Sequence, residues 1–229
     1  QFLIRQIIPI KKMTVKETHQ LNFVVKKTNE LSMDEIDKIN NLFNSVFKPF
    51  LTKERTNEEF KKKFLNNFLK FSFHGLMKLN DEIIGCYHVI PYEFNYFSQK
   101  KLFGQSVDTT INSKYRGNIY NLKRLANMVY EKLKKHQIVF VYGLPNEKFY
   151  LVKKRVLGWK DIGKLNYYIY PINFKKFLKN FKFLNFPLLI LVKIFFKLKI
   201  SIKKDKDFSI SKIYNNDFHY GRYNDNHKI

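Results

Sequence analysis

Two amphipathic segments near the start of the chain predict helices. Apolar residues recur at helical spacing over 36–47 and again over 60–68. Each segment follows a Ser/Thr-x-x-Glu sequence, at 32–35 and at 56–59, in which the hydroxyl and the carboxylate cap each other's backbone N–H groups. A short apolar run at 21–26 precedes both. We therefore predict one strand followed by two consecutive helices.

Three extended apolar runs come next and predict antiparallel strands. Residues 73–79 and 83–90 are separated by a polar turn, which is typical of a hairpin. Pro91 interrupts the second strand, which resumes over 92–97, so we expect a bulge or a sheet edge at the proline. Another polar turn leads into a third strand over 102–112.

The remaining pattern alternates helices and strands. Residues 118–135 keep a 3.6-residue apolar period, and the uniformly apolar 138–142 is typical of a central strand reached by a helical crossover. A helix over 147–157 ends at Gly158, a position that needs a positive φ. A strand over 165–170 follows. The predicted fold class is α+β, with one mixed, mostly antiparallel sheet flanked by helices.

The large positive net charge does not by itself indicate nucleic-acid binding. The formal net charge is +24, but the cations are nearly all lysines, whereas base readout and bidentate phosphate contacts favour arginine. The lysines accompany many Asn, Ile and Phe residues, a mixture that AT-rich codon usage produces without selection for a ligand. We therefore expect a solvated lysine-rich surface and no nucleic-acid partner.

Cysteine and histidine chemistry is limited. Cys86 is the single cysteine, so neither a disulfide within the chain nor a thiolate metal cluster can form, and we expect no metal site. Because Cys86 and His88 lie in an apolar strand sequence, we interpret them as core residues in preference to a nucleophile and a base.

The two ends of the chain differ from its middle. Residues 1–12 lack the features of a signal peptide, so we expect a leader or a disordered segment there and a cytoplasmic protein. The main domain is predicted over 13–175. Residues 176–229 form a basic amphipathic extension, interpreted as the truncated start of a further region. Its apolar stretch at 183–192 is too short to span a bilayer. It could lie on the inner face of an anionic membrane or pack as a helix on a protein domain.

One turn carries candidate chemistry. The strand over 102–112 leads to Arg116 and Gly117, and a helix begins directly afterwards. A helix that starts at such a turn presents unpaired N–H groups and the positive end of its dipole. This arrangement predicts a pocket for a phosphate group.

Four motifs in order resemble the GNAT (N-acetyltransferase) superfamily. They occupy residues 104–110, 115–117, 142–146 and 157–163, and the resemblance spans roughly residues 20–175. More narrowly, they resemble a bacterial subfamily linked to sugar or polysaccharide modification. The resemblance implies acetyl-CoA as co-substrate and an amine of a small or sugar-linked molecule as acceptor. The second glycine of the family's phosphate loop is missing, and Asn118 stands in its place because Asn tolerates the left-handed region.

The resemblance also implies which residues hold acetyl-CoA. Backbone amides near Thr110 and Ile111 would bind the acetyl oxygen, and Arg116 would stand beside the pyrophosphate. Asn146 occupies the turn where the pantetheine arm would pass. The expected cofactor-binding residues are Thr109, Thr110, Ile111, Arg116, Gly117, Asn118, Ile119, Tyr120 and Asn146.

Direct attack by an amine requires an acid and a base. Tyr150 is the candidate acid, with packing beneath its helix as the alternative role, and the position that tyrosine holds in many members of the family falls near Lys153. Asp108 and Glu93 are the candidate bases, although a bound water could replace either and Asp108 could be structural. The predicted function is acetyl-CoA-dependent N-acetylation. The alternative is a non-catalytic module that binds acyl-CoA, nucleic acid or a membrane surface.

Overall fold

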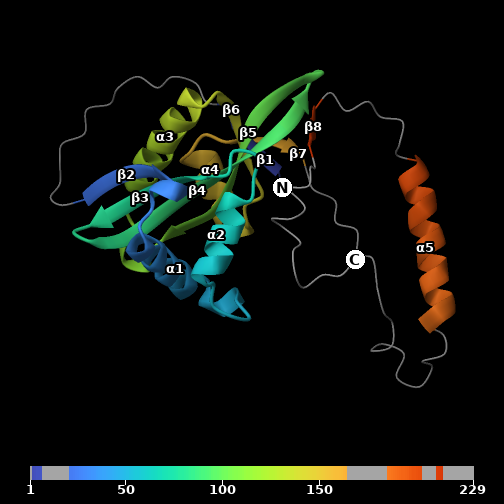
Figure 1. Cartoon of the computed structure of the whole chain (residues 1–229), viewed down its shortest axis with the longest axis horizontal. Helices are drawn as coiled ribbons and strands as arrows, with labels where there is room; N and C mark the ends of the chain where they lie inside the picture. Colours follow the sequence, from blue (N-terminus) through green and yellow to red (C-terminus); the bar gives the residue numbers. More distant parts are fainter. Residues whose placement is uncertain (1, 7–20, 164–184, 203–209, 214–229) are drawn as a thin grey trace. The chain divides into compact units, whose positions relative to one another are not determined.

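The computed structural model describes residues 2–6, 21–163, 185–202 and 210–213, in two compact units. The first unit comprises residues 1–163 and 210–229 and contains the sheet (Figure 1). The described part of the second unit is helix α5 (Asn185–Ile202). Among the described residues, no helix is long and apolar enough to cross a membrane.

One mixed, mostly antiparallel sheet organises the first unit, as predicted. Eight strands are present in the described residues, in the order β2-β3-β4-β5-β6-β1-β7, and β8 pairs with β4. The parallel pair is β5 and β6. The strands are β1 (Phe2–Gln6), β2 (Leu21–Lys27), β3 (Phe73–Leu79), β4 (Glu82–Tyr96), β5 (Gln99–Ile111), β6 (Ile138–Gly143), β7 (Lys160–Gly163) and β8 (Ile210–Lys212).

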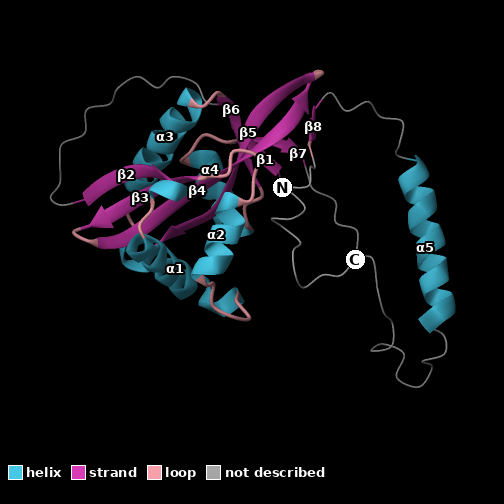
Figure 2. Cartoon of the chain, viewed as in Figure 1, coloured by secondary structure: helices cyan, strands magenta, loops and turns pink. Residues whose placement is uncertain are grey.

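Helices cover both faces of the sheet (Figure 2). One face packs against α1 and α2 through a core that includes Ile36, Phe60 and Leu76. The other face packs against α3 and α4 through a core that includes Leu125 and Trp159. The helices are α1 (Met33–Phe47), α2 (Asn57–Leu65), α3 (Ile119–Lys135) and α4 (Glu147–Arg155). Both predicted capping boxes are present, at Ser32 and at Thr56.

Strand β1 differs from the expectation for the start of the chain. We expected a leader or disordered segment over 1–12, but Phe2–Gln6 pairs with β6 on one side and β7 on the other. Strand β6 lies more than 130 residues away in sequence, so the local pattern of residues 2–6 does not predict that its backbone groups pair with β6. The predicted strand over 165–170 lies outside the described residues.

Pro91 lies where the sheet is incomplete. Strand β4 runs through it without a break. Along β4, however, pairing with β3 stops at Val89 and pairing with β8 starts at Phe94. The carbonyl of Glu93 points away from β5, because it accepts a hydrogen bond from the N–H of Ile213. Alternation along the strand places the nitrogen of Pro91 on the same side, where none of the described strands pairs with it. This gap between the described strands agrees with the expected sheet edge, and the missing N–H leaves no ladder bond unmade among the described strands.

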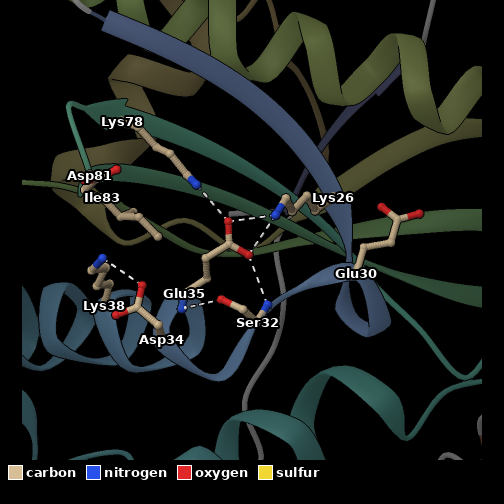
Figure 3. A pocket seen from close by; sticks show the side chains of 9 residues that line it. All are labelled: Lys26, Glu30, Ser32, Asp34, Glu35, Lys38, Lys78, Asp81 and Ile83. Carbon is tan, nitrogen blue, oxygen red and sulfur yellow. Dashed lines mark hydrogen bonds and ion pairs between the residues drawn. The ribbon is translucent and has the colours of Figure 1, made fainter.

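Glu35 joins α1 to the edge of the sheet (Figure 3). Its carboxylate accepts hydrogen bonds from Lys26 of β2 and Lys78 of β3, and it also caps the N–H of Ser32. Burial alone would raise the pKa of Glu35, but the two lysines outweigh it and lower that pKa to about 2. These residues line a surface pocket of about 260 Å³. Because the central Glu35 carboxylate is already paired with two lysines, we interpret these residues as stabilising the fold.

Replacing Glu35 with Gln tests this interaction. Glutamine can keep the helix cap but loses both ion pairs, so we expect a loss of about 2 kcal/mol of unfolding free energy at pH 7. Because the folded-state pKa is lowered, the difference from wild type should persist above pH 4.5 and disappear as pH falls toward 2. Urea denaturation across that range measures it. Glu59→Gln, in the second capping box, is the matched control and should have a smaller effect.

Candidate functional site

The two parallel strands stop pairing part-way along their length. Strands β5 and β6 pair from Leu102 opposite Ile138 to Gln105 opposite Tyr142, with a shift of register between Leu102 and Phe103. Beyond that point β5 continues to Ile111, whereas β6 ends at Gly143. Backbone groups that leave a sheet ladder need other partners, so such an opening is suited to an extended ligand.

Lys153 of α4 lies where the pairing of β5 and β6 ends. Its side chain is buried, and its Nζ lies 3.2 Å from the hydroxyl oxygen of Ser106 on β5. A Cβ placed on Gly143 of β6 would lie 2.7 Å from the same Nζ, so the glycine leaves the space that the ammonium fills. The ammonium also stands 4.1 Å from the ring centroid of Trp159. Lys153 therefore places a cation between the two strands.

This cation has no anion beside it. Among the described residues, no carboxylate lies within ion-pair distance of Lys153, and its polar and cation–π contacts are to a hydroxyl and to aromatic rings. Burial without a counter-charge disfavours the charged form and lowers the pKa of Lys153 to about 7. Near neutral pH the side chain can therefore both hold and give up a proton.

A bulge in β5 lies a few residues further along the strand. Asp108 and Thr109 together oppose Tyr87 of β4, and Asp108 has a φ of +45°. The Asp108 carboxylate accepts hydrogen bonds from Nη1 of Arg55 at 2.8 Å and from Nζ of Lys63 at 2.7 Å. Nζ of Lys63 also donates to the other oxygen, Oδ1, at 2.8 Å, so both carboxylate oxygens are engaged by cations. These contacts fit the structural role that the sequence analysis gave as the alternative to a base for Asp108.

Arg55 itself is held by several neighbours. Its Nε donates to Oδ1 of Asn40 at 2.6 Å, and its guanidinium carbon stands 3.7 Å from the ring centroid of Phe43. Its Nη2 is buried and has no hydrogen-bond partner among the described residues. The connection between α1 and α2 therefore brings a fixed cation to the bulge.

Glu93 is distant from Asp108. It lies five residues beyond His88 on β4, where it pairs with Leu102 at the other end of β5. Alternation along β4 also places its side chain on the same face as Val89, opposite the face on which Asp108 meets Arg55. The two candidate bases therefore do not lie together.

Cys86 and His88 are core residues, as predicted. Burial lowers the pKa of His88 well below its ordinary value, and its Nδ1 lies 2.8 Å from Nδ1 of His74. Burial raises the pKa of the Cys86 thiol to about 12, which keeps the thiol protonated.

The turn before α3 is exposed and organised by its own side chains. Nε of Arg116 donates to the carbonyl oxygen of Ile111 at 2.9 Å, which fixes the guanidinium beside the end of β5. Asn118 caps α3 by accepting from the N–H of Tyr120 at 3.0 Å. We expected Asn118 in the left-handed region, but its φ is −98°, because a residue that caps a helix has extended backbone. That expectation was wrong.

Gly117 has open space around it. A Cβ at this position would meet no atom within 4 Å, and its φ is not among the positive values. The protein's own packing therefore does not require a glycine at this turn. The side chains of Ile119 and Tyr120, in the first turn of α3, are also exposed.

The remaining candidates lie on α4. Asn146 caps this helix through the N–H of Phe149 at 2.9 Å. The hydroxyl of Tyr150 donates to Asp161 of β7 at 2.9 Å and accepts from Lys154, and its ring packs against the core. Gly158 has the predicted positive φ, +68°. The contacts of Tyr150 fit the packing alternative, since its hydroxyl is engaged on the exposed side.

Lys153 is the site residue to which sequence reasoning gave no role. The available signal was a lysine on the apolar side of the 147–157 helix, three or four residues from Phe149, Val156 and Leu157. The burial of the lysine and its neighbours Ser106 and Gly143 depend on contacts across the sheet.

Replacing Lys153 with Met should stabilise the protein. The buried ammonium opposes folding because the unfolded chain holds this proton more tightly than the folded protein does. The lowering of the Lys153 pKa from 10.5 to about 7 corresponds to about 5 kcal/mol. The gain over wild type should be full below pH 7 and should shrink as pH rises toward 10.5. Urea denaturation at pH 6, 8 and 10 measures it, and a gain independent of pH would contradict a charged Lys153.

Comparisons with known proteins agree with this architecture. Two solved structures align with a TM-score of 0.50. One is a predicted acetyltransferase with acetyl-CoA from Clostridium acetobutylicum, at 15% identity over 65% of this chain and 96% of that chain. The other is an aminoglycoside acetyltransferase from an uncultured soil metagenomic sample in complex with trehalose, at 13% identity over 66% of this chain and 96% of that chain. At these identities the likeness concerns the fold.

A third structure is a conserved protein of unknown function from Enterococcus faecalis V583. It aligns over 58% of this chain at 18% identity and a TM-score of 0.42, and the chain spans 31% of its length. No curated protein matches the chain. A sequence model of the acetyltransferase (GNAT) domain matches residues 27–166, which is more than half of the chain. The chain therefore belongs to the GNAT acetyltransferase family.

Proposed function

We propose that this protein transfers the acetyl group of acetyl-CoA to an amine by direct attack, with a small or sugar-linked molecule as acceptor. The observation that carries the proposal is the opening between β5 and β6, which begins after Gln105 and Tyr142 and contains a buried cation. The turn at Arg116 and Gly117, where a phosphate could bind, follows the end of β5. One extended ligand with a phosphate end and a reactive end suits both features.

The turn before α3 would hold the pyrophosphate. The first turn of α3 contains no acidic residue, so its N–H groups and dipole can attract an anion. Arg116 adds a cation whose position is fixed by the Ile111 carbonyl. The open space at Gly117 supports this assignment, because close approach of a ligand gives a reason for a glycine that packing does not require.

The bulge in β5 would receive the acetyl end. A bulge takes backbone groups out of the regular ladder, and amides near Thr109, Thr110 and Ile111 are the proposed partners of the acetyl oxygen. Acetyl-CoA supplies an activated thioester. The chain's contribution is to hold that thioester next to the acceptor, which lowers the barrier mainly by positioning.

Proton removal from the amine is assigned to a bound water. Arg55 and Lys63 already occupy the Asp108 carboxylate, and Glu93 lies on the other face of the sheet. Asp108 instead fixes the bulge against the α1–α2 connection. This connection, with the unpartnered Nη2 of Arg55, is the proposed neighbour of the acceptor. The assignment of a sugar-linked acceptor, and of a role in polysaccharide biosynthesis, rests on the sequence motifs.

Gly117→Ala tests the proposed phosphate site. We expect acetyl-CoA binding to weaken at least tenfold by calorimetry, because the added methyl occupies the space assigned to the pyrophosphate, while the melting temperature of the free protein stays unchanged. Gly163→Ala is the matched control, since its Cβ would also meet open space, but on β7. Equal affinities in the two variants would remove Gly117 from the site.

Activity is tested by the release of free CoA thiol from acetyl-CoA in the presence of amino sugars and other small amines. Wild type should release thiol with at least one of them, and Arg116→Ala should require more acetyl-CoA to reach the same rate. Tight acetyl-CoA binding without turnover of any amine would favour the non-catalytic acyl-CoA-binding alternative. Absence of acetyl-CoA binding would contradict the proposed function altogether.

A further inference from the structure

The buried ammonium of Lys153 lies at one defined point of the sheet. Ser106 on β5 and Gly143 on β6 are the first residues beyond the last register pair of the two parallel strands. The Lys153 Nζ contacts the hydroxyl of the first and fills the space beside the second. It therefore stands at the head of the opening.

We propose that Lys153 donates the proton that the sulfur of CoA takes up when the acetyl group leaves; this inference rests on the proposed function. A bond forms between the acceptor nitrogen and the acetyl carbon, and the bond between that carbon and the sulfur breaks. The sulfur takes a proton from the Lys153 ammonium. The proton released by the attacking amine passes to water, and Lys153 regains a proton from solvent before the next cycle. The products are an N-acetyl amine and a free thiol.

The surroundings of Lys153 suit this role. An ordinary lysine, with a pKa of about 10.4, holds its proton more tightly than an alkyl thiol such as cysteine, with a pKa of about 8.5. Burial without a carboxylate partner reverses this order, since the pKa of Lys153 is about 7. The side chain can then give its proton to a thiolate, and a substantial fraction of it is still protonated at neutral pH.

None of the described residues places an anion near Lys153, and this points in the same direction. A buried cation without a counter-charge is costly, and a negative charge that develops on a ligand would offset that cost. Tyr150, the acid expected from the sequence, directs its hydroxyl toward Asp161 and Lys154 on the exposed side of α4. Among the described residues, Lys153 is the acid group that lies beside Ser106 and Gly143, where the pairing of β5 and β6 ends.

The test measures the ionisation of CoA itself, so it needs no acceptor. CoA is bound at saturation to wild type, Lys153→Met and Lys148→Met, and the ultraviolet absorbance of its thiolate is followed from pH 6 to pH 10. Lys148 is exposed on the same helix, so its variant controls for the loss of one positive charge. Urea denaturation verifies that each variant is folded.

We expect about tenfold more thiolate at pH 7, where about half of the Lys153 side chains carry a proton, in the complexes of wild type and Lys148→Met than in that of Lys153→Met. A cation about 4 Å from the sulfur stabilises the thiolate to at least that degree. Equal thiolate fractions in all three complexes would overturn the inference and leave the proposed function standing.

Two other results are decisive. Incubation with acetyl-CoA followed by peptide mass mapping should leave Lys153 unmodified, whereas an acetyl group on its Nζ would make it a nucleophile and overturn its role as proton donor. Failure of wild type to bind CoA at all would overturn the proposed function and this inference together.

Discussion

The loss of pairing between β5 and β6 is the constraint on which the proposed site depends. Parallel strands that stayed in register would satisfy each other's backbone groups and leave no room between them. In this protein the register ends at Gln105 and Tyr142, and Lys153, Ser106, Gly143 and Trp159 meet at that point. The same feature explains why a lysine is buried without a carboxylate, because the sheet offers it a hydroxyl and aromatic faces only.

A second interaction fixes the opposite face of the sheet. Asp108 adopts a positive φ in the bulge of β5, which is unfavourable for a residue with a side chain, and two cations hold it there. Arg55 belongs to the connection between α1 and α2, and Lys63 belongs to α2. The helices that cover this face are thus tied to the bulge by charge as well as by apolar packing. In the proposed function, this tie aligns the acceptor side with the acetyl end.

The features predicted from sequence are those that depend on residues close together in the chain. The capping boxes at Ser32 and Thr56, the positive φ of Gly158 and the strand edge at Pro91 follow from local rules. The partners of Asp108 lie 45 and 53 residues away, and no local pattern identifies them. The pairing of β1 with β6 and the burial of Lys153 likewise depend on distant segments. The GNAT fold was recognised because four separate motifs occur in the right order.

The central claim is that one acetyl-CoA molecule occupies both the turn at Gly117 and the opening between β5 and β6. A crystal structure of the protein with CoA tests it most directly. The account predicts the pyrophosphate on the backbone N–H groups at the start of α3, and the sulfur within hydrogen-bonding distance of the Lys153 Nζ. A CoA molecule whose sulfur lies away from the β5–β6 opening, or whose pyrophosphate lies away from Arg116 and Gly117, would contradict it.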